Sequence, residues 1–370
     1  MKFAIITQIT HKKKGSQWFS YAPYIREMQL WQQYVSEIQI VSPISKEEIG
    51  VNEMAYLEKD IPHVRINEFD ITNFKNILKA IVEIPLILTK IYREMKWADH
   101  IHLRCPGNVG LLGCFVQILF PKTPKTVKYA GNWDPKSRQP VSYRLQKWVL
   151  SNTFLTKNCK VLVYGNWKNQ SRNIIPFFTA SYSENEIKDI PEKRLNKEIN
   201  LIFVGNFSKG KQPLKSVEVA EQLHNNGHSI KLNMYGEGVE FKNIESYVEK
   251  NSLNNFVKLH GNQSKETIKR AFQESHFLVF ISKSEGWPKV VAEAMFWSCL
   301  PISTSVSCIP YMLGEGKRGT ITKGDKTEIV QIIEGHLNNE QKYLSSVYQA
   351  KEWSQNYTIE KFSKAINELL

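Results

Sequence analysis

The chain has 370 residues, which is too long for one ordinary core and suits two domains of about 150 to 200 residues each. A hydrophobic content of 42% with 11% aromatic residues excludes a disordered chain. The formal net charge of +13 favours an anionic small molecule or an anionic membrane surface as partner, since the sequence has no zinc-finger spacing, recognition-helix pattern or RNP-like aromatic string for nucleic acid.

Cysteine usage and segment length predict a cytoplasmic protein. The cysteines lie in apolar surroundings without a C-x-x-C pair, which favours reduced and buried thiols, and they are Cys105, Cys114, Cys159, Cys299 and Cys308. The opening MKFAIITQITHKKKG has the charge order of a first strand, not of a signal peptide. The apolar stretches 81–92 and 111–120 are too short or too interrupted to span a bilayer and read as core helices or as an amphipathic face lying on a membrane.

In the first half of the chain, apolar runs alternate with helical spacing. Strand 2–9 is followed by a polar loop containing Lys12, Lys13, Lys14 and Gly15. Later elements are helix 24–34, strand 37–42, helix 73–95, strand 98–105, helix 107–120, strand 126–130 and strand 161–164, with 180–183 closing the domain. In an open parallel sheet, ligands sit beyond the carboxyl ends of strands, so the loop after the first strand is expected to form one wall of a cleft.

Two strand ends in this half carry candidate site residues. Arg104 ends strand 98–105 and is expected to point into the cleft between the domains, whereas His100 and His102 do not predict a metal site. Strand 126–130 is followed by Asn132, Trp133 and Asp134. Because Asn and Asp are also turn formers, this loop reads either as a functional loop or as a capped turn.

The second half repeats a strand-helix unit after a charged, proline-broken linker. Strand 199–205 leads through Asn206, Lys209 and Lys211 to helix 214–223. The units that follow are strand 230–235 with Gly236, a helix to about residue 250, strand 256–260 with Gly261 and Asn262, and helix 264–274. These repeats predict a doubly wound sheet.

The next unit contains two carboxylates at a helix mouth. Strand 277–281 runs into Glu285 and Gly286, Pro288 opens a helix to about residue 297, and Glu293 lies in its second turn. The free N–H groups and positive dipole of such a junction tolerate phosphate. Lys289 and Glu293 are four residues apart on the same helix face. Glu293 is therefore equally well interpreted as one partner of a solvent-exposed ion pair with Lys289.

The run S-E-G-W-P-K-V-V-A-E-A-M, residues 284–295, resembles the Glu-x7-Glu signature of family 4 glycosyltransferases. These are retaining enzymes of GT-B architecture, with two Rossmann-like domains facing across a cleft. The resemblance implies that Glu293 bonds the ribose of a nucleotide-diphosphate sugar, that Glu285 contacts the donor sugar, and that Lys211 meets the diphosphate. It covers the second domain well and the first only in outline.

The full set of predicted site residues is wider. The catalytic candidates are Glu285 and Lys211, with Asn132 and Asp134 added on position alone. The acceptor-side candidates are Arg104 and Trp133, which lie at or just after strand ends. The donor-binding set adds Gly15, Gly205, Asn206, Lys209, Gly236, Gly261, Asn262, Gly286, Trp287 and Pro288 to Lys211, Glu285 and Glu293. No metal is expected, since the sequence has no acidic cluster that demands a divalent ion.

The chain also departs from the family pattern. Asn206 replaces a phosphate-binding arginine, Gln212 replaces a glycine, and the G-G-x-P-E motif is reduced to Pro310. The histidine that many members carry near Asn132 is absent, which leaves Asn132 or Asp134 as candidates on position alone. The identity of the donor is therefore not inferred from common members.

The sequence predicts an acceptor domain over 1–185, a linker over 186–198, a donor domain over 199–352 and a final helix, 353–370, that crosses back. The expected activity is transfer of a sugar to a glycan or lipid-linked acceptor in surface polysaccharide or glycoconjugate biosynthesis, in the cytoplasm or at the inner face of the cell membrane. The alternatives are a nucleotide-sugar epimerase and a non-catalytic subunit that binds a nucleotide sugar.

Overall fold

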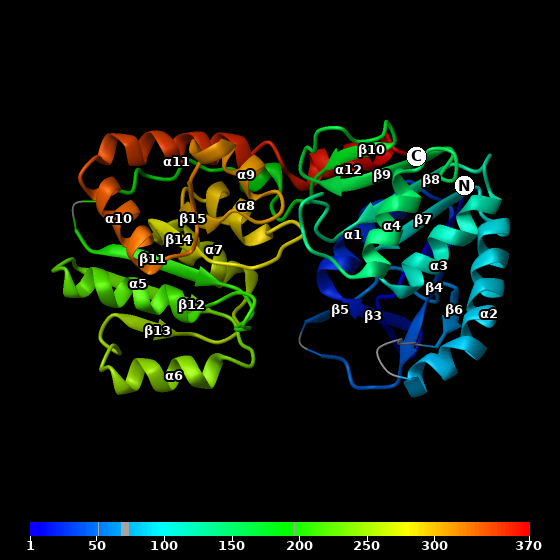
Figure 1. The fold of residues 1–370 in the computed structure, drawn as a ribbon, viewed down its shortest axis with the longest axis horizontal. Helices are drawn as coiled ribbons and strands as arrows, with labels where there is room; N and C mark the ends of the chain where they lie inside the picture. Colours follow the sequence, from blue (N-terminus) through cyan, green and yellow to red (C-terminus); the bar gives the residue numbers. More distant parts are fainter. Residues whose placement is uncertain (51, 68–73, 196) are drawn as a thin grey trace. The chain divides into compact units, whose positions relative to one another are not determined.

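The computed structural model describes residues 1–50, 52–67, 74–195 and 197–370, and the side chains of 74–81 are not described. These residues form two compact units (Figure 1). The first contains Met1–Phe177 together with Ser363–Leu370, and the second is Phe178–Phe362. Each unit is built on its own sheet, as expected for two Rossmann-like domains.

A mostly parallel sheet organises the first unit. Strand β1 (Lys2–Ile6) lies between β4 (Glu37–Ser45) and β7 (His100–Cys105), and Phe3 pairs in register with both Ile38 and His100. The described part of this sheet has ten strands. Beyond β7 come β8 (Lys125–Tyr129), β9 (Cys159–Tyr164) and β10 (Ile174–Phe177); on the other side are β2 (His11–Lys14), β3 (Gln17–Tyr21), β5 (Glu53–Ala55) and β6 (His63–Ile66).

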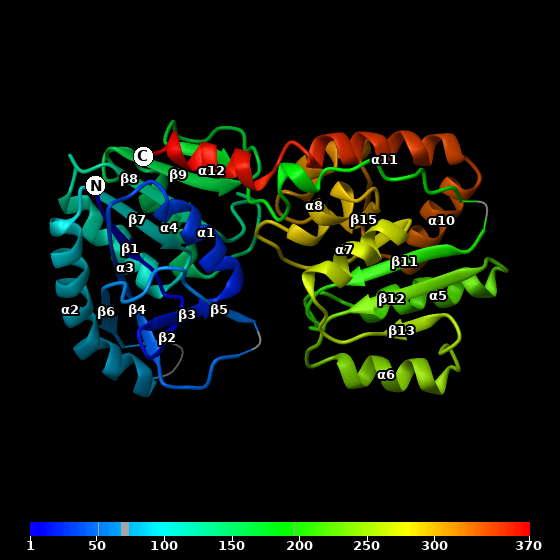
Figure 2. The same cartoon turned by 180° about the vertical axis from the view of Figure 1, so that it is seen from behind.

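Helices cover both faces of this sheet, which explains why almost every residue of its central parallel strands is buried. One face carries α2 (Phe74–Trp97), α3 (Asn108–Val116) with the 3-10 turn η1 (Gln117–Leu119), and α4 (Val141–Ser151) (Figure 1). The other face carries α1 (Ala22–Gln32), shown in Figure 2. The predicted first residue of α2, Asn73, lies outside the described residues.

The second unit is a parallel sheet with the order β13-β12-β11-β14-β15-β16. Helices α5 and α10 pack together on one face, and α7 and α8 pack on the other (Figures 1 and 2). The strands are β11 (Ile199–Val204), β12 (Ile230–Tyr235), β13 (Val257–Leu259), β14 (Phe277–Phe280), β15 (Leu300–Thr304) and β16 (Thr320–Thr322). The helices are η2 (Glu184–Glu186), α5 (Leu214–Asn225), α6 (Phe241–Lys250), α7 (Lys265–Glu274), α8 (Lys289–Phe296), α9 (Ile309–Met312), η3 (Gly314–Gly316), α10 (Lys326–Leu337) and α11 (Glu340–Ser354).

The segment between the two sheets belongs with the second unit. Residues 187–195 have no helix or strand, and Asn196 of the predicted linker lies outside the described residues. Lys193 anchors this segment, because its ammonium donates to the carbonyl oxygens of Phe272, Ser275 and Trp297 at 2.8, 2.7 and 2.9 Å. The linker is therefore fastened to the ends of α7 and α8.

The prediction of one helix over 353–370 was wrong. Helix α11 ends at Ser354, and α12 (Ile359–Asn367) begins after the four residues 355–358. Residues from Ser363 onward group with the first unit, where the Ser363 hydroxyl bonds the Tyr34 hydroxyl at 2.8 Å and Lys160 donates to the carbonyl oxygen of Glu368 at 3.1 Å.

The expectation of buried thiols is confirmed. All five cysteines are buried and none of them forms a disulfide. Within the described part of the chain, no helix is both long enough and apolar enough to cross a membrane. His100 and His102 are also buried, and one ring nitrogen of each, Nε2 of His100 and Nδ1 of His102, bonds the Thr126 hydroxyl at 3.0 and 2.9 Å.

Candidate functional site

The carboxyl edge of the second sheet contains a topological switch point. Strands β11 and β14 are neighbours, and the chain leaves β11 towards β12 but leaves β14 towards β15, on the opposite side. In open α/β sheets, ligands bind beyond the strand ends where the order reverses in this way. The two loops at this point are 205–213, after β11, and 281–288, after β14.

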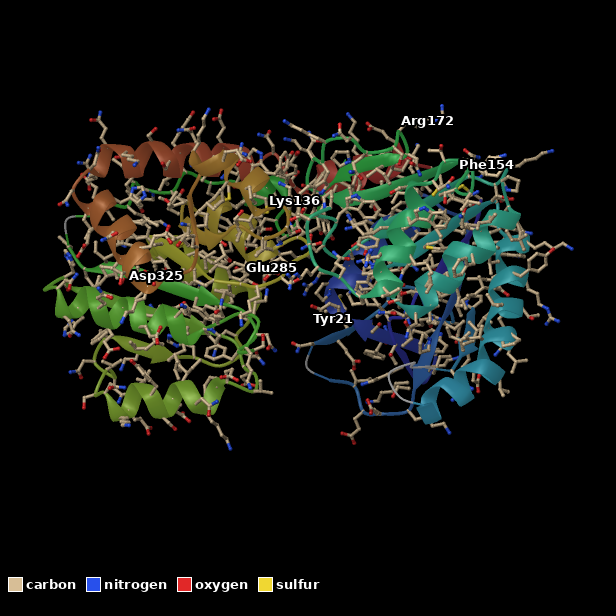
Figure 3. The ribbon with its side chains drawn as sticks, viewed as in Figure 1. Tyr21, Lys136, Phe154, Arg172, Glu285 and Asp325 are labelled. Carbon is tan, nitrogen blue, oxygen red and sulfur yellow. The ribbon has the colours of Figure 1, made fainter. Side chains whose placement is uncertain are left out.

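An ion pair joins these two loops. The Lys211 ammonium donates to the Glu285 carboxylate, and the two side chains are 25% and 9% exposed. The ammonium also lies 4.7 Å from the centre of the Phe280 ring, and the Lys283 N–H donates to the Gly210 carbonyl oxygen at 2.9 Å. Two predicted ligand-binding groups are therefore in direct contact. Figure 3 shows Glu285 in the loop that follows β14.

Buried hydroxyl groups hold the second loop in place. Thr304 accepts from the Ser282 N–H at 3.0 Å and donates to the Ser282 carbonyl oxygen at 2.6 Å. The Ser307 hydroxyl donates to the Gly286 carbonyl oxygen at 2.9 Å. Neither residue was predicted from the sequence as part of the site; the available signal for Thr304 was a hydroxyl side chain at the end of strand β15.

Two positions where the family pattern has glycine keep a glycine-like backbone. Gln212 has φ of +43° and Ser307 has φ of +50°, both in the left-handed region that non-glycine residues rarely adopt. The replacement of glycine by Gln212 and Ser307 therefore does not remove the turn at either position.

Glu293 has a separate partner. Its carboxylate accepts a hydrogen bond from the Ser181 hydroxyl at 2.5 Å, and its side chain is partly exposed. Ser181 belongs to the segment between β10 and η2. The Glu293 carboxylate is therefore not turned outward to bulk water. It bonds Ser181 and takes no part in the Lys211–Glu285 ion pair.

Trp287 and Pro288 differ from their predicted roles. The Trp287 side chain is only 8% exposed and packs on Trp353 and Tyr357, with ring centres 6.4 and 6.0 Å away. Trp287 therefore fixes the signature loop to α11 and does not present an indole to a ligand. Pro288 is the N-cap of α8, not its first helical residue.

Glycines allow the three strand-end loops beside this pair to approach one another. A side chain on Gly236 would place its Cβ 2.0 Å from the Gly205 carbonyl oxygen, and Gly236 has φ of +128°. The Gly236 N–H donates to the Gly261 carbonyl oxygen at 2.8 Å. The predicted donor-binding glycines of β11, β12 and β13 are thus brought together.

The polar side chains of these loops differ in their surroundings. Asn262 donates to the Glu237 carboxylate at 3.3 Å. Asn206 and Lys209 are exposed, and Lys209 has no ion pair among the described residues. Lys209 thus remains available to an anion, whereas Lys211 already has a carboxylate partner.

The loop after β8 is a capped turn. The Asp134 N–H donates to the Asn132 side-chain oxygen at 2.8 Å, and Asp134 Oδ1 accepts from the Lys136 N–H at 2.8 Å. Trp133 is only 1% exposed and its indole donates to Gln170 at 3.0 Å. The side chains of Asn132 and Asp134 therefore form a capped turn, as the turn-forming interpretation expected, and the Trp133 side chain is almost fully buried.

Arg104 and Gly15 also differ from expectation. The Arg104 guanidinium donates to the Glu27 carboxylate at 2.5 Å, with both side chains almost buried, instead of pointing from the sheet into a cleft. Residues 12–14 form strand β2 rather than a loop, and Gly15 lies in the tight turn to β3 with φ of +62°. Glycine suits that turn because a two-residue hairpin needs a positive φ.

Residues 184–353 match the family model of glycosyl transferases group 1. The second unit is similar to this family. An uncharacterized glycosyltransferase of Methanocaldococcus jannaschii is 29% identical over 162 residues, which are 43% of this chain and 44% of the relative. The chain spans about half the length of the curated relatives it matches.

Solved glycosyltransferase structures share the fold along the whole chain. Anabaena HepE, in complex with UDP and glucose, aligns with a TM-score of 0.66 over 100% of this chain and 97% of its own, at 14% identity. WaaG, a glycosyltransferase involved in lipopolysaccharide biosynthesis, aligns with a TM-score of 0.65 over 99% of both chains, at 12% identity. The fold of two Rossmann-like units is thus the GT-B fold predicted from the sequence.

Proposed function

We propose that this protein is a retaining glycosyltransferase of family 4 that moves a sugar from a nucleotide-diphosphate donor to a glycan or lipid-linked acceptor. The observation that carries the proposal is the Lys211–Glu285 contact at the switch point of the second sheet. The group 1 glycosyl transferase match over residues 184–353 supports it independently, because that match includes both loops.

In this proposal, each charged residue has a separate task. Lys211 has three N–H donors, so an ammonium that bonds Glu285 can still donate to a diphosphate. Negative charge grows on the diphosphate as the glycosidic bond breaks, so a fixed cation there stabilises the transition state more than the ground state. Glu285 contacts the donor sugar, and Glu293, oriented by Ser181, bonds the ribose hydroxyls.

We further propose that catalysis needs no metal ion. The protein would act in the cytoplasm or at the cytoplasmic face of the membrane, in surface polysaccharide or glycoconjugate biosynthesis. The net charge of +13 supports attraction to anionic headgroups. Chelator should leave the turnover unchanged, and the protein should sediment with anionic vesicles but not with neutral ones.

Turnover by matched variants tests the activity. A thermal-shift panel of nucleotide sugars identifies the donor, because a ligand that binds only the folded state raises its stability. With that donor, Lys211→Met and Glu293→Ala should each lower kcat/KM by about a hundredfold or more, since each removes a charged contact. The control Lys242→Met removes an exposed lysine of α6 and should behave as wild type.

Two further outcomes separate the alternatives. Conversion of the donor with no acceptor present would indicate an epimerase, and binding without any turnover would indicate a non-catalytic subunit. Wild-type turnover by both Lys211→Met and Glu293→Ala would contradict the proposal.

A further inference from the structure

A hollow of about 280 Å³ lies within the first unit, and none of the residues that line it was assigned a donor role. Its walls are the loop after β8, one face of α4, and Gln170 from the segment after β9. Figure 3 labels Lys136 in the loop that forms one wall. The lining residues are Trp133, Pro135, Ser137, Gln139, Arg144, Lys147, Trp148, Ser151 and Gln170.

The charged groups of this hollow are all positive. Arg144 and Lys147 lie one turn apart on α4, and no carboxylate is among the lining side chains. Neither cation forms an ion pair within the described part of the chain. An anion entering the hollow would therefore meet two cations that no protein carboxylate neutralises by direct contact.

The Lys147 ammonium is held in place by two contacts with the wall of the hollow. Its ammonium donates to the Asp134 carbonyl oxygen at 3.2 Å and lies 5.2 Å from the centre of the Trp133 ring. Burial lowers the pKa of Lys147 to about 8, against the opposing effect of the Asp134 carboxylate. The ammonium has thus lost part of its hydration, and hydrogen bonds to a bound anion would compensate for the lost water contacts.

The neutral groups of the hollow suit a sugar. Gln139 and Ser137 are bonded to each other at 2.8 Å, and Gln139 also accepts from Tyr129 at 3.3 Å, so these side chains are already oriented. Ser151 adds another hydroxyl, and Trp148, which is 59% exposed, offers a flat indole on which the C–H face of a sugar ring can pack.

The volume limits the ligand. Pockets for small molecules usually measure roughly 300 to 1,000 Å³, so a hollow of about 280 Å³ lies just below that range. It suits one sugar ring with one anionic group and is too small for an oligosaccharide.

We propose that this hollow binds a phosphorylated sugar, with Arg144 and Lys147 on the phosphate and Trp148 on the ring. The identification of that sugar as part of the acceptor rests on the proposed function. Binding itself does not, because the hollow lies wholly within the first unit.

Indole N–H resonances and calorimetry test the proposal on the full chain. The probes are the 1- and 6-phosphates of glucose, mannose, galactose and N-acetylglucosamine, the free sugars, and inorganic phosphate. At least one sugar phosphate should shift the Trp133 and Trp148 indole signals, assigned through Trp→Phe variants. The Trp353 signal should stay unchanged, because Trp353 does not line the hollow. It should bind about tenfold more tightly than phosphate or the free sugar alone, since both parts contribute contacts.

Matched variants assign the site. Lys147→Met and the exposed Arg144→Gln should each weaken sugar-phosphate binding by about tenfold. The control Lys136→Met removes an exposed lysine of the same loop that does not line the hollow, and should bind as wild type. Arg144→Gln lies at the surface and keeps the test valid if Lys147→Met does not fold.

The outcomes separate this proposal from the glycosyltransferase proposal. If no sugar phosphate binds, or if binding ignores Arg144 and Lys147, the hollow is not such a site, whatever the nucleotide-sugar assays show. Equal affinity for inorganic phosphate would likewise overturn the sugar part. A protein that binds a sugar phosphate here but turns over no nucleotide sugar would overturn only the transferase and the acceptor identification.

Discussion

Lys211 and Glu285 are 74 residues apart in sequence and yet form a direct ion pair. Each side chain comes from a loop at the carboxyl end of a central strand, so their contact follows from the parallel order of β11 and β14. The Glu285 carboxylate is only 9% exposed, and removal of its cation would leave it poorly solvated. The pair is therefore part of the local structure as well as a candidate ligand site.

Ser181 provides a test of the ribose-binding role of Glu293. Its hydroxyl bonds the Glu293 carboxylate, so Ser181→Ala frees that carboxylate to rotate and should weaken binding of the donor's nucleoside diphosphate by about fivefold, or roughly 1 kcal/mol. Calorimetry measures the change. The matched control is Ser183→Ala, whose hydroxyl bonds Glu360 instead and should keep wild-type affinity. Equal affinities for both variants and wild type would argue against a ribose contact through Glu293.

Backbone position was easier to predict for site residues than side-chain direction. The place of Lys211 and Glu285 at strand ends follows from local patterns, and both lie where expected. Trp287 occupies the expected loop, but its indole turns to Trp353, which is remote in sequence. Trp133 and Arg104 similarly turn inward to Gln170 and Glu27, partners that no local pattern reveals.

At the scale of elements, predictions succeeded where burial and periodicity agree. Strands β12 and β15 have the predicted bounds, because both are short apolar runs with clear ends. Helix α4 was missed because its pattern is inverted: Val141 and Trp148 are 77% and 59% exposed, whereas Gln146 is fully buried. The β2–β3 hairpin was missed because its lysines resemble a solvated loop, although Lys12 pairs with Glu53 at 3.1 Å.

The glycine contact between the β11 and β12 loops has a large predicted stability effect. Gly236→Ala would place a methyl group 2.0 Å from the Gly205 carbonyl oxygen, at a φ that alanine disfavours, and should lower the free energy of unfolding by about 3 kcal/mol or more. Gly335→Ala is the control. It adds a methyl group to α10 with no atom within 4 Å and should raise the free energy of unfolding by about 0.5 to 1 kcal/mol. Urea unfolding of both variants measures the two effects, and a neutral Gly236→Ala would contradict the close contact.

The Lys193 anchor makes a prediction for the segment before the second sheet. Lys193→Met would remove the ammonium donor from three carbonyl oxygens at the ends of α7 and α8, and should lower the free energy of unfolding by about 2 to 4 kcal/mol. Lys188→Met, an exposed change in the same segment, should cost less than about 0.5 kcal/mol. Denaturant unfolding compares the two, and equal losses would show that the segment is not fastened by Lys193.

At the scale of the whole molecule, buried histidines in both units predict sensitivity to acid. Burial lowers the pKa of His11 and His102 to about 3 and that of His100, His276 and His336 to about 4. In the unfolded chain the pKa of histidine is about 6.5. Between these values the unfolded chain binds protons that the folded chain does not, so the free energy of unfolding falls as the pH falls from 6.5.

Each such histidine can remove up to about 3 kcal/mol by pH 4, so five of them together can remove about as much as the upper end of a typical total stability of 5 to 15 kcal/mol. We therefore expect cooperative unfolding between about pH 6 and pH 4. Circular dichroism during an acid titration measures the midpoint. His228→Gln, a change of a partly exposed histidine paired with Glu334, should leave that midpoint almost unchanged. A protein that stays folded at pH 3 would contradict the prediction.

The central claim is that a nucleoside diphosphate binds at the carboxyl edge of β11 and β14. A crystal structure of the protein with the nucleotide chosen by the thermal-shift panel tests this claim most directly. We predict that the diphosphate will lie within hydrogen-bond distance of the Lys211 ammonium, with the ribose hydroxyls on the Glu293 carboxylate. A nucleotide bound elsewhere, with Lys211 and Glu293 contacting only protein, would contradict the account.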